Sequence, residues 1–241
     1  MNYLDMLAKL GIGSAHPGGF TATLELLDTA SIGQQARILE VGCGTGRTAC
    51  HLARLGYQVT AVDIRSDMLM KARHRAEQEQ VQVNFVQGNV EHLPFDAGSF
   101  DVVLAESVTL FADTLCALRE YARVLAPGGR LYDREMIALQ SLEDVIARRV
   151  SKYYGVGEVW TAEQWIELLE QAGLREIDLL QPGKLNEFDW SDEMEHPDMS
   201  GVVDASVYFD QRIWDLTREY DDIMYQYKDQ FGFGVWTGVK G

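Results

Sequence analysis

A glycine-rich stretch between a short apolar run and a helical pattern constrains this chain more than any other feature. The apolar run is ARILEV, residues 36–41, and it is typical of a strand that is covered on both faces of a parallel sheet. Gly42, Gly44 and Gly46 follow at alternate positions, and from Arg47 onward apolar residues recur at helical spacing. A strand, a glycine turn and a helix in this order let a ligand approach the backbone N–H groups at the start of the helix.

The spacing of the glycines decides which ligands fit this turn. The turn reads Glu40-x-Gly42-x-Gly44-x-Gly46, so the dinucleotide fingerprint G-x-G-x-x-G and the phosphate loop G-x-x-x-x-G-K-S/T are both absent. Taken alone, the turn also fits a tight connection without a ligand. A second feature favours a ligand, because Asp63 lies at the end of the next apolar run. An acidic residue about 20 positions after the turn binds the ribose hydroxyls in nucleotide-type sites.

Length and composition indicate a globular protein with one core. The chain has 241 residues, of which 46% are hydrophobic and 24% are charged. The net charge of −16 argues against nucleic acid as a partner, because phosphate contacts need a surface rich in Lys and Arg. We expect no signal peptide and no membrane span, since the apolar runs are short. The three cysteines match no metal-ligand spacing, so we expect reduced thiols, a cytoplasmic location and no metal.

Strand and helix patterns alternate along most of the chain. This alternation predicts an α/β fold, in which a doubly wound, mostly parallel sheet carries helices on both faces. The closing segment, FGFGVWTGVK, adds a seventh strand. Strands are expected at 36–41, 57–64, 83–87, 100–107, 130–137, 174–180 and 231–240, and helices at 2–10, 21–30, 66–80, 113–125, 141–152 and 161–172, with Ser66 as a cap.

The C-terminal part departs from this alternation. Residues 184–200 are acidic and loop-like, and we interpret the acidic run at 187–198 as a solvated face. Residues 202–229 form one long helical pattern, either continuous or broken. A connection of this length beside a binding face is typical of a lid. We therefore expect a single domain over 1–241, with N-terminal cap helices at 1–30 and a helical, aromatic lid insertion at about 182–230. The aromatic side chains of the C-terminal part either line an apolar or cationic pocket or pack in the core, and their helical spacing favours the core. They are Trp190, Tyr208, Phe209, Trp214, Tyr220, Tyr225, Tyr227, Phe231, Phe233 and Trp236.

Four motifs in a fixed order carry a family resemblance. They are LEVGCGTG, AVDI, GNVEHLPFDAGSFDVV and RVLAPGGRL. Over residues 30–137 the chain resembles the class I S-adenosylmethionine-dependent methyltransferases, in particular the small-molecule group similar to the ubiquinone/menaquinone C-methyltransferases. The resemblance implies a Rossmann-like sheet of seven strands with an antiparallel last strand. It also implies S-adenosylmethionine as cofactor and S-adenosylhomocysteine as product.

The resemblance further implies a role for individual residues. Many relatives carry Asp where this chain has Asn89, whose amide oxygen can still accept a hydrogen bond. Carboxylates suit the sulfonium and the amino group of the cofactor, and its lack of a pyrophosphate agrees with the absence of the dinucleotide spacing. The implied contacts are Glu40, Gly42, Cys43, Gly44 and Gly46 at the methionyl end, Asp63 at the ribose, Ile64 against the adenine, Asn89, Val90 and Glu91 along the adenine edge, and Glu106 with Ser107 near the sulfonium.

Methyl transfer from a sulfonium is an in-line displacement, for which the protein aligns the reactants and excludes water. A base is needed only if the nucleophile arrives protonated. Candidates for catalytic residues are His16, Tyr132, Arg134 and Glu135, together with the pair Tyr153–Tyr154. Neighbouring residues of a strand face opposite sides, so those on the fifth strand cannot all reach one pocket. Arg134 and Glu135 fit a structural ion pair equally well, and loop statistics favour a surface position for His16.

We therefore expect an enzyme that methylates a small molecule and exists as a monomer or homodimer. The acceptor atom stays open. Two alternatives also stay open: a methyltransferase that acts on protein or another macromolecule, and a protein that binds S-adenosylmethionine without catalysis. The sequence AESV after the fourth strand differs from the N/D-P-P-Y/F tetrapeptide of amide-nitrogen methylases. A nicotinamide cofactor would need the missing G-x-G-x-x-G offset.

Overall fold

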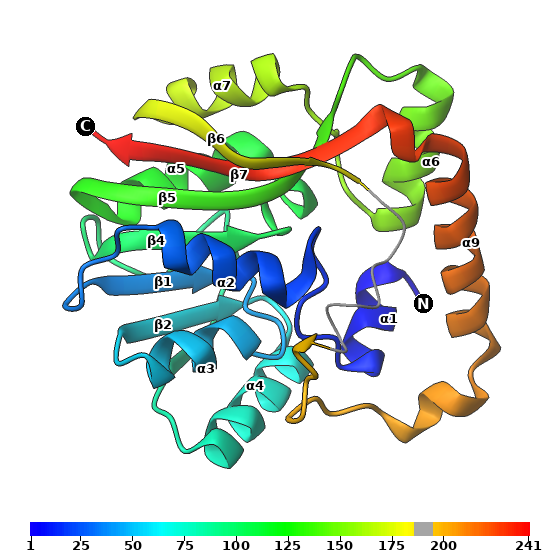
Figure 1. The fold of residues 1–241 in the computed structure, drawn as a ribbon, viewed down its shortest axis with the longest axis horizontal. Helices are drawn as coiled ribbons and strands as arrows, with labels where there is room; N and C mark the ends of the chain where they lie inside the picture. The colour runs from blue at the N-terminus through cyan, green and yellow to red at the C-terminus, as the bar shows by residue number, and fades with distance from the viewer. Residues whose placement is uncertain (186–194) are drawn as a thin grey trace.

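The computed structural model describes residues 1–185 and 195–241, and its centre is one seven-stranded sheet (Figure 1). The strands are β1 (Arg37–Val41), β2 (Gln58–Asp63), β3 (Asn84–Gln87), β4 (Phe100–Glu106), β5 (Leu125–Ala138), β6 (Leu174–Lys184) and β7 (Phe231–Lys240). Their order is β3-β2-β1-β4-β5-β7-β6. The pairs from β3 to β5 are parallel, and β7 runs antiparallel to β5 and β6. This arrangement confirms the predicted fold class and its antiparallel last strand.

Helices cover both faces of the sheet and one of its ends. They are α1 (Tyr3–Leu10), α2 (Gly19–Thr29), α3 (Arg47–Arg54), α4 (Ser66–Glu79), α5 (Thr114–Val124), α6 (Asp144–Tyr154), α7 (Ala162–Gln171) and α9 (Gln211–Tyr227), with short 3₁₀ turns η1 (Thr109–Phe111), η2 (Ala205–Phe209) and η3 (Lys228–Gln230). In Figure 1, α2, α3 and α4 lie on one face, α5 and α7 lie on the other, and α9 runs along the end beside α1 and α6. No helix among the described residues is long and apolar enough to cross a membrane.

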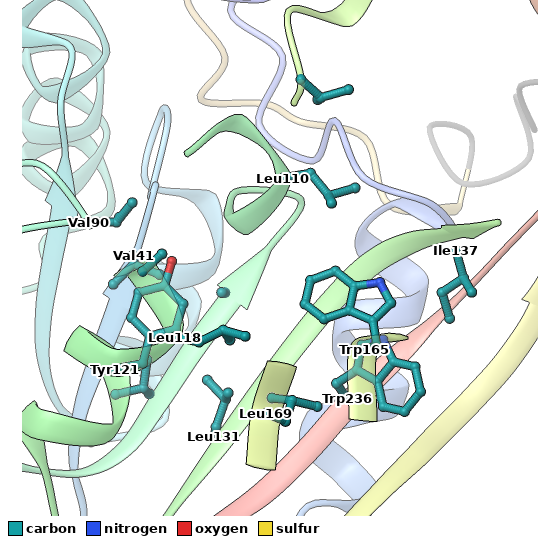
Figure 2. Close-up of a cluster of buried hydrophobic side chains, with 14 of the residues drawn as sticks. Val41, Val90, Leu110, Leu118, Tyr121, Leu131, Ile137, Trp165, Leu169 and Trp236 are labelled. Atoms are coloured by element: carbon teal, nitrogen blue, oxygen red, sulfur yellow. The ribbon is translucent and has the colours of Figure 1, made fainter. Parts of the chain in front are cut away.

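Each face of the sheet buries its own apolar core. Figure 2 shows the larger core, in which Leu118 and Tyr121 of α5 and Trp165 of α7 pack against Leu131 of β5 and Trp236 of β7. The second core joins α2, α3 and α4 to the opposite face of the central strands. Because helices cover both faces of the sheet, both faces of its central strands are buried and apolar. This burial explains the apolar runs in the sequence.

Several expected boundaries need correction. Ser66 is the first residue of α4 and not its cap; Arg65 occupies that position, without a side-chain hydrogen bond. α2 begins at Gly19 rather than residue 21, because Gly18 takes a left-handed φ of 83° as its N-cap. β5 begins at Leu125, directly after α5, and not at residue 130.

The long helical pattern near the C-terminus is interrupted. η2 and α9 are separated at Asp210, whose side chain accepts a hydrogen bond from the backbone N–H of Arg212 and so begins α9. Core packing, which the spacing favoured, holds for Phe231 and Trp236. It is wrong for four of the aromatic residues, since Tyr208, Phe209, Trp214 and Tyr225 are exposed, while Trp190 lies outside the described residues.

Candidate functional site

The glycine turn after β1 has a backbone that only glycine adopts readily. Gly42, Gly44 and Gly46 have φ values of 60°, 52° and 75°. A Cβ on Gly42 would lie 2.3 Å from Cγ2 of Val108, and a Cβ on Gly46 would lie 2.9 Å from that of Ala72. A Cβ on Gly44 would meet no atom within 4 Å. The turn is therefore packed at both ends and open at Gly44, where a ligand can reach the backbone.

Asp63 ties the end of β2 to this turn. Its Oδ2 accepts a hydrogen bond of 2.8 Å from the backbone N–H of Gly44, and its Oδ1 accepts one of 2.8 Å from that of Arg65. The side chain is buried, and burial raises the pKa of Asp63 even though both hydrogen bonds act in the opposite direction. Each carboxylate oxygen has a second lone pair, so Asp63 can still accept hydrogen bonds from a diol.

Glu40 is a buried carboxylate with an unused oxygen. It is 6% exposed, and its Oε2 has no hydrogen-bond partner among the described residues. Burial raises the pKa of Glu40 well above its usual value, and the nearby Glu106 and Asp63 carboxylates raise it further. A buried polar atom without a partner costs about 1–3 kcal/mol. The unpartnered Oε2 of Glu40, at the end of β1, therefore indicates a place for a positively charged ligand group.

Glu106, at the end of β4, is the centre of a hydrogen-bonded network under α2. It accepts hydrogen bonds from the hydroxyls of Thr23 and Thr48, at 2.8 and 3.2 Å, and from Nε of Arg134 at 3.3 Å. Nε2 of His16 lies 3.2 Å from the Thr23 hydroxyl and 3.7 Å from Glu106. The side chain of His16 is only 5% exposed. The surface position favoured for His16 is therefore wrong, because the loop folds inward onto Glu106.

The candidates on β5 point to opposite faces, as the alternation of a strand requires. Tyr132 packs in the core beneath α2, and Arg134 donates to Glu106, to the carbonyl of Ala22 and to Gln181. Glu135 instead accepts hydrogen bonds from the backbone N–H groups of Val108 and Thr109. An ion pair between Arg134 and Glu135 is therefore wrong; Arg134 pairs with Glu106. The pair Tyr153–Tyr154 packs against Tyr3 of α1.

The residues expected along the adenine lie at the ends of β2 and β3. Ile64 is 60% exposed, so its side chain is available to a ring. The amide oxygen of Asn89 accepts a hydrogen bond from the backbone N–H of Glu91, and Val90 is buried behind it. Cys43 is buried within the turn, and burial raises the pKa of its thiol, which agrees with a structural role for this cysteine.

The sequence indicated a cap and a lid, but it did not identify the side chains that hold these segments near the site. Arg47, at the start of α3, donates to the hydroxyl of Ser14 and to the carbonyl of His196, and its guanidinium lies 4.2 Å from the ring centre of Phe20. Residues 196–204, named here the strap, thus lie over the glycine turn beside the loop 11–18. The position of Arg47 directly after the turn was visible in the sequence, whereas its partner in the strap was not.

Asp198 of the strap corrects a second expectation. The acidic run from residue 187 to 198 was interpreted as a solvated face, but the side chain of Asp198 is only 13% exposed and pairs with Arg75 of α4. Most of the remaining acidic residues of that run lie in 186–194, outside the described residues. Within the described part of the chain, no group of three or more His, Cys, Asp or Glu side chains is placed to hold a metal ion.

The residues present fit S-adenosylmethionine, the cofactor that the sequence resemblance implies. The unused oxygen of Glu40 suits the cofactor's amino group, and the open backbone at Gly44 admits the ligand. The N-terminus of α3 suits its carboxylate. Asp63 retains lone pairs for the ribose hydroxyls. Glu106, which is paired with Arg134, is a further carboxylate close enough to Glu40 to raise its pKa.

Comparisons with known proteins point in one direction. Residues 39–133 match a family model described as a methyltransferase domain. The chain is 34% identical over 240 residues to the uncharacterized methyltransferase YodH of Bacillus subtilis, a match that covers 99% of each chain. It is 32% identical over 170 residues to a ubiquinone biosynthesis O-methyltransferase of Xanthomonas oryzae pv. oryzae, covering 70% of this chain and 66% of that one.

A solved structure extends the comparison to the whole fold. Phosphoethanolamine N-methyltransferase 2 of Haemonchus contortus, in complex with S-adenosyl-L-methionine, superposes with a TM-score of 0.75 at 21% identity. The match covers 98% of this chain and 57% of that chain. At this identity the likeness concerns the fold, and it includes the segments that precede and follow the family match.

Proposed function

Because the chain belongs to the class I S-adenosylmethionine-dependent methyltransferases, we propose that it transfers the methyl group of S-adenosylmethionine to a small-molecule acceptor. Membership of the family rests on the match to YodH along nearly the full length of the chain. S-adenosylmethionine is accordingly the cofactor and S-adenosylhomocysteine the product. What we propose beyond the family and its cofactor is that the acceptor is a small molecule.

The observation that carries the proposal is the enclosure of the site. Glu40, Asp63 and His16 have side chains that are less than a tenth exposed. The loop 11–18 and the strap lie over the glycine turn, joined to it through Arg47. The surface of a folded macromolecule cannot approach such a site without displacing these segments, whereas a small molecule needs only a narrow entrance. We accordingly propose that residues 1–30 act as a cap and that the insertion at about 182–230 acts as a lid of one domain.

Catalysis in this site consists of alignment and exclusion of water. When bound, the cofactor supplies a methyl group on a positively charged sulfur, which is already a good leaving group. Glu40, Asp63 and the glycine turn would hold the cofactor, and the buried surroundings keep water away from the methyl group. His16, beside Glu106, is the candidate best suited to remove a proton from an acceptor, since Glu135 is occupied by backbone N–H groups and Tyr132 by the core.

A label-transfer experiment tests the proposal. The purified protein is incubated with S-adenosylmethionine carrying a radioactive methyl group and a whole-cell extract, and the products are separated into small molecules, protein and nucleic acid. We expect label in a small-molecule product other than S-adenosylmethionine, and none above the enzyme-free background in any product with Asp63→Ala. Label in the protein or nucleic-acid fraction would establish a macromolecular acceptor instead. Binding of S-adenosylmethionine without transfer to any fraction would support the non-catalytic alternative.

A further inference from the structure

Three buried cations of α3 and α4 hold the strap in place. Arg47, Lys71 and Arg75 are 7%, 7% and 2% exposed. Lys and Arg side chains are almost never buried to this extent unless they are paired. Each of the three has a partner in the strap, which lies more than 120 residues further along the chain. A cluster of this kind indicates that the position of the strap over the site is specified and not incidental.

Arg75 connects the strap directly to the cofactor turn. Its Nε donates to the carbonyl of Thr45 at 2.9 Å, and Nη2 lies 3.3 Å from the Thr45 hydroxyl. The same guanidinium forms a two-point pair with Asp198, at 2.6 and 2.7 Å. Thr45 stands between Gly44 and Gly46, so one side chain holds both the glycine turn and the strap. Two-point pairs between Arg and a carboxylate fix geometry as well as adding energy.

The other two cations hold the strap at its ends. Arg47 donates to the carbonyl of His196 at one end. At the other end Nζ of Lys71 donates to the carbonyl of Val202 at 2.8 Å and lies 3.0 Å from the carboxylate of Asp204. Lys71 also donates to the carbonyl of Ala8 in α1, at 2.6 Å. The strap is thus held between the N-terminal segment and the helices that follow the cofactor turn.

The loop 11–18 fits closely against the strap. A Cβ on Gly13 would lie 2.8 Å from Oδ2 of Asp198 and 3.1 Å from the side chain of Arg47. A Cβ on Gly11 would lie 2.2 Å from the carbonyl oxygen of Val202. Glycine at these positions lets the two covering segments approach each other. The loop 11–18 and the strap therefore pack directly against each other.

We propose that Arg75 and Asp198 are positioning residues of the cofactor site, which fix the glycine turn and set the rate at which S-adenosylmethionine and S-adenosylhomocysteine leave. Arg75 holds the Thr45 backbone in the conformation that admits the cofactor. Asp198 holds the strap across the exit, and its removal leaves a buried guanidinium that favours an opened, hydrated strap. This inference rests on cofactor binding by the family and not on the size of the acceptor.

The test is the dissociation rate of labelled S-adenosylmethionine, measured by a chase with excess unlabelled cofactor. For Asp198→Asn we expect the dissociation rate to rise by about tenfold or more, the effect of losing a charge-assisted hydrogen bond. Asp198→Glu keeps the charge and should retain most of the slow release. The matched control is Asp101→Asn, which removes a two-point pair with Arg37 remote from the glycine turn. It should leave the rate within about twofold of the wild type.

Two results separate a positioning role from a merely structural one. If Asp198→Asn lowers the melting temperature but dissociates at the wild-type rate, the proposal is wrong. If Asp198→Asn does not fold, Gly13→Ala carries the test, since its added methyl group displaces Asp198 without removing a charge. An unchanged dissociation rate in Gly13→Ala would then overturn the proposal. All of these measurements use the cofactor alone, so they are independent of the acceptor screen.

Discussion

Glu40→Gln offers the sharpest test of how the site holds its cofactor. The substitution keeps the size of the side chain and removes its charge, at a position where Oε2 has no partner among the described residues. The proposed partner of this oxygen is the amino group of S-adenosylmethionine. A hydrogen bond between charged groups contributes about 1.5–3 kcal/mol. We therefore expect the dissociation constant to rise by about 10- to 150-fold.

The same substitution should change the pH dependence of binding. Burial, and then the nearby Glu106 and Asp63, raise the pKa of Glu40 in the free protein. Pairing with an ammonium group lowers that pKa again, so binding should release a proton and the affinity should increase as the pH rises above the usual range of a carboxyl group. Calorimetric titration in two buffers of different ionisation enthalpy measures this proton release, which Glu40→Gln should abolish.

In the ligand-free protein, the contribution of Glu40 to stability should fall as the pH rises, whereas the affinity for the cofactor should increase. A carboxyl group with a raised pKa in the folded state lowers stability as the pH rises above its unfolded-state pKa, because the unfolded chain ionises first. Glu40→Gln should therefore melt at an equal or higher temperature than the wild type at pH 8. Glu77→Gln, an exposed residue of α4, serves as the control. Unchanged affinity and unchanged proton release in Glu40→Gln would refute the assignment of Glu40 to the cofactor.

Three further predictions concern neighbouring carboxyl groups and His16. Asp63→Asn keeps only one oxygen to accept from the backbone N–H groups of Gly44 and Arg65. The free energy of unfolding, measured by heat or urea, should therefore fall by about 1.5–3 kcal/mol, and cofactor binding should weaken. The control Asp67→Asn, in a half-exposed pair with Arg65, should cost about 1 kcal/mol. Burial raises the pKa of Asp133 from 3.8 to about 7, so the contribution of this carboxyl group to the unfolding free energy should fall as the pH rises from about 4 to about 7. Relative to the wild type, Asp133→Asn should therefore gain stability over this range, which urea unfolding at several pH values measures. With an acceptor that arrives protonated, His16→Gln should reduce the single-turnover rate of methyl transfer about 10²- to 10⁴-fold and leave the cofactor affinity unchanged. An unaltered rate with such an acceptor would exclude His16 as the base.

The local part of the site was predictable from the sequence. The glycine turn and Asp63 stand next to the strands that position them, and strand ends meet at one edge of a parallel sheet, as the register of Val41 with Val62 and Ala105 confirms. Periodicity also predicted the sheet, because strands buried on both faces are apolar throughout. The closing strand at 231–240 appears with the expected boundaries.

The cover of the site was not predictable in the same way. Asp198 pairs with Arg75 across 123 residues, and no local sequence pattern distinguishes it from the other acidic residues of the same run. His16 stands in a loop whose glycine and proline content predicts only a turn, while its inward position depends on Thr23 and Glu106. Long-range ion pairs have no sequence period, so they emerge only when the fold brings the partners together.

The electrostatics of the site follow one principle. Glu40, Asp63 and Glu106 are three carboxyl groups at neighbouring strand ends; burial raises the pKa of Glu40, and repulsion by the other two raises it further. A sequence selected for stability alone would replace at least one of them, because buried charges without partners are costly. Glu106 and Asp63 are partly compensated by protein donors, whereas Oε2 of Glu40 is not. The unpartnered Oε2 of Glu40 is therefore the feature that specifies a cationic ligand. For the same reason, Glu40→Gln should stabilise the free protein and weaken cofactor binding.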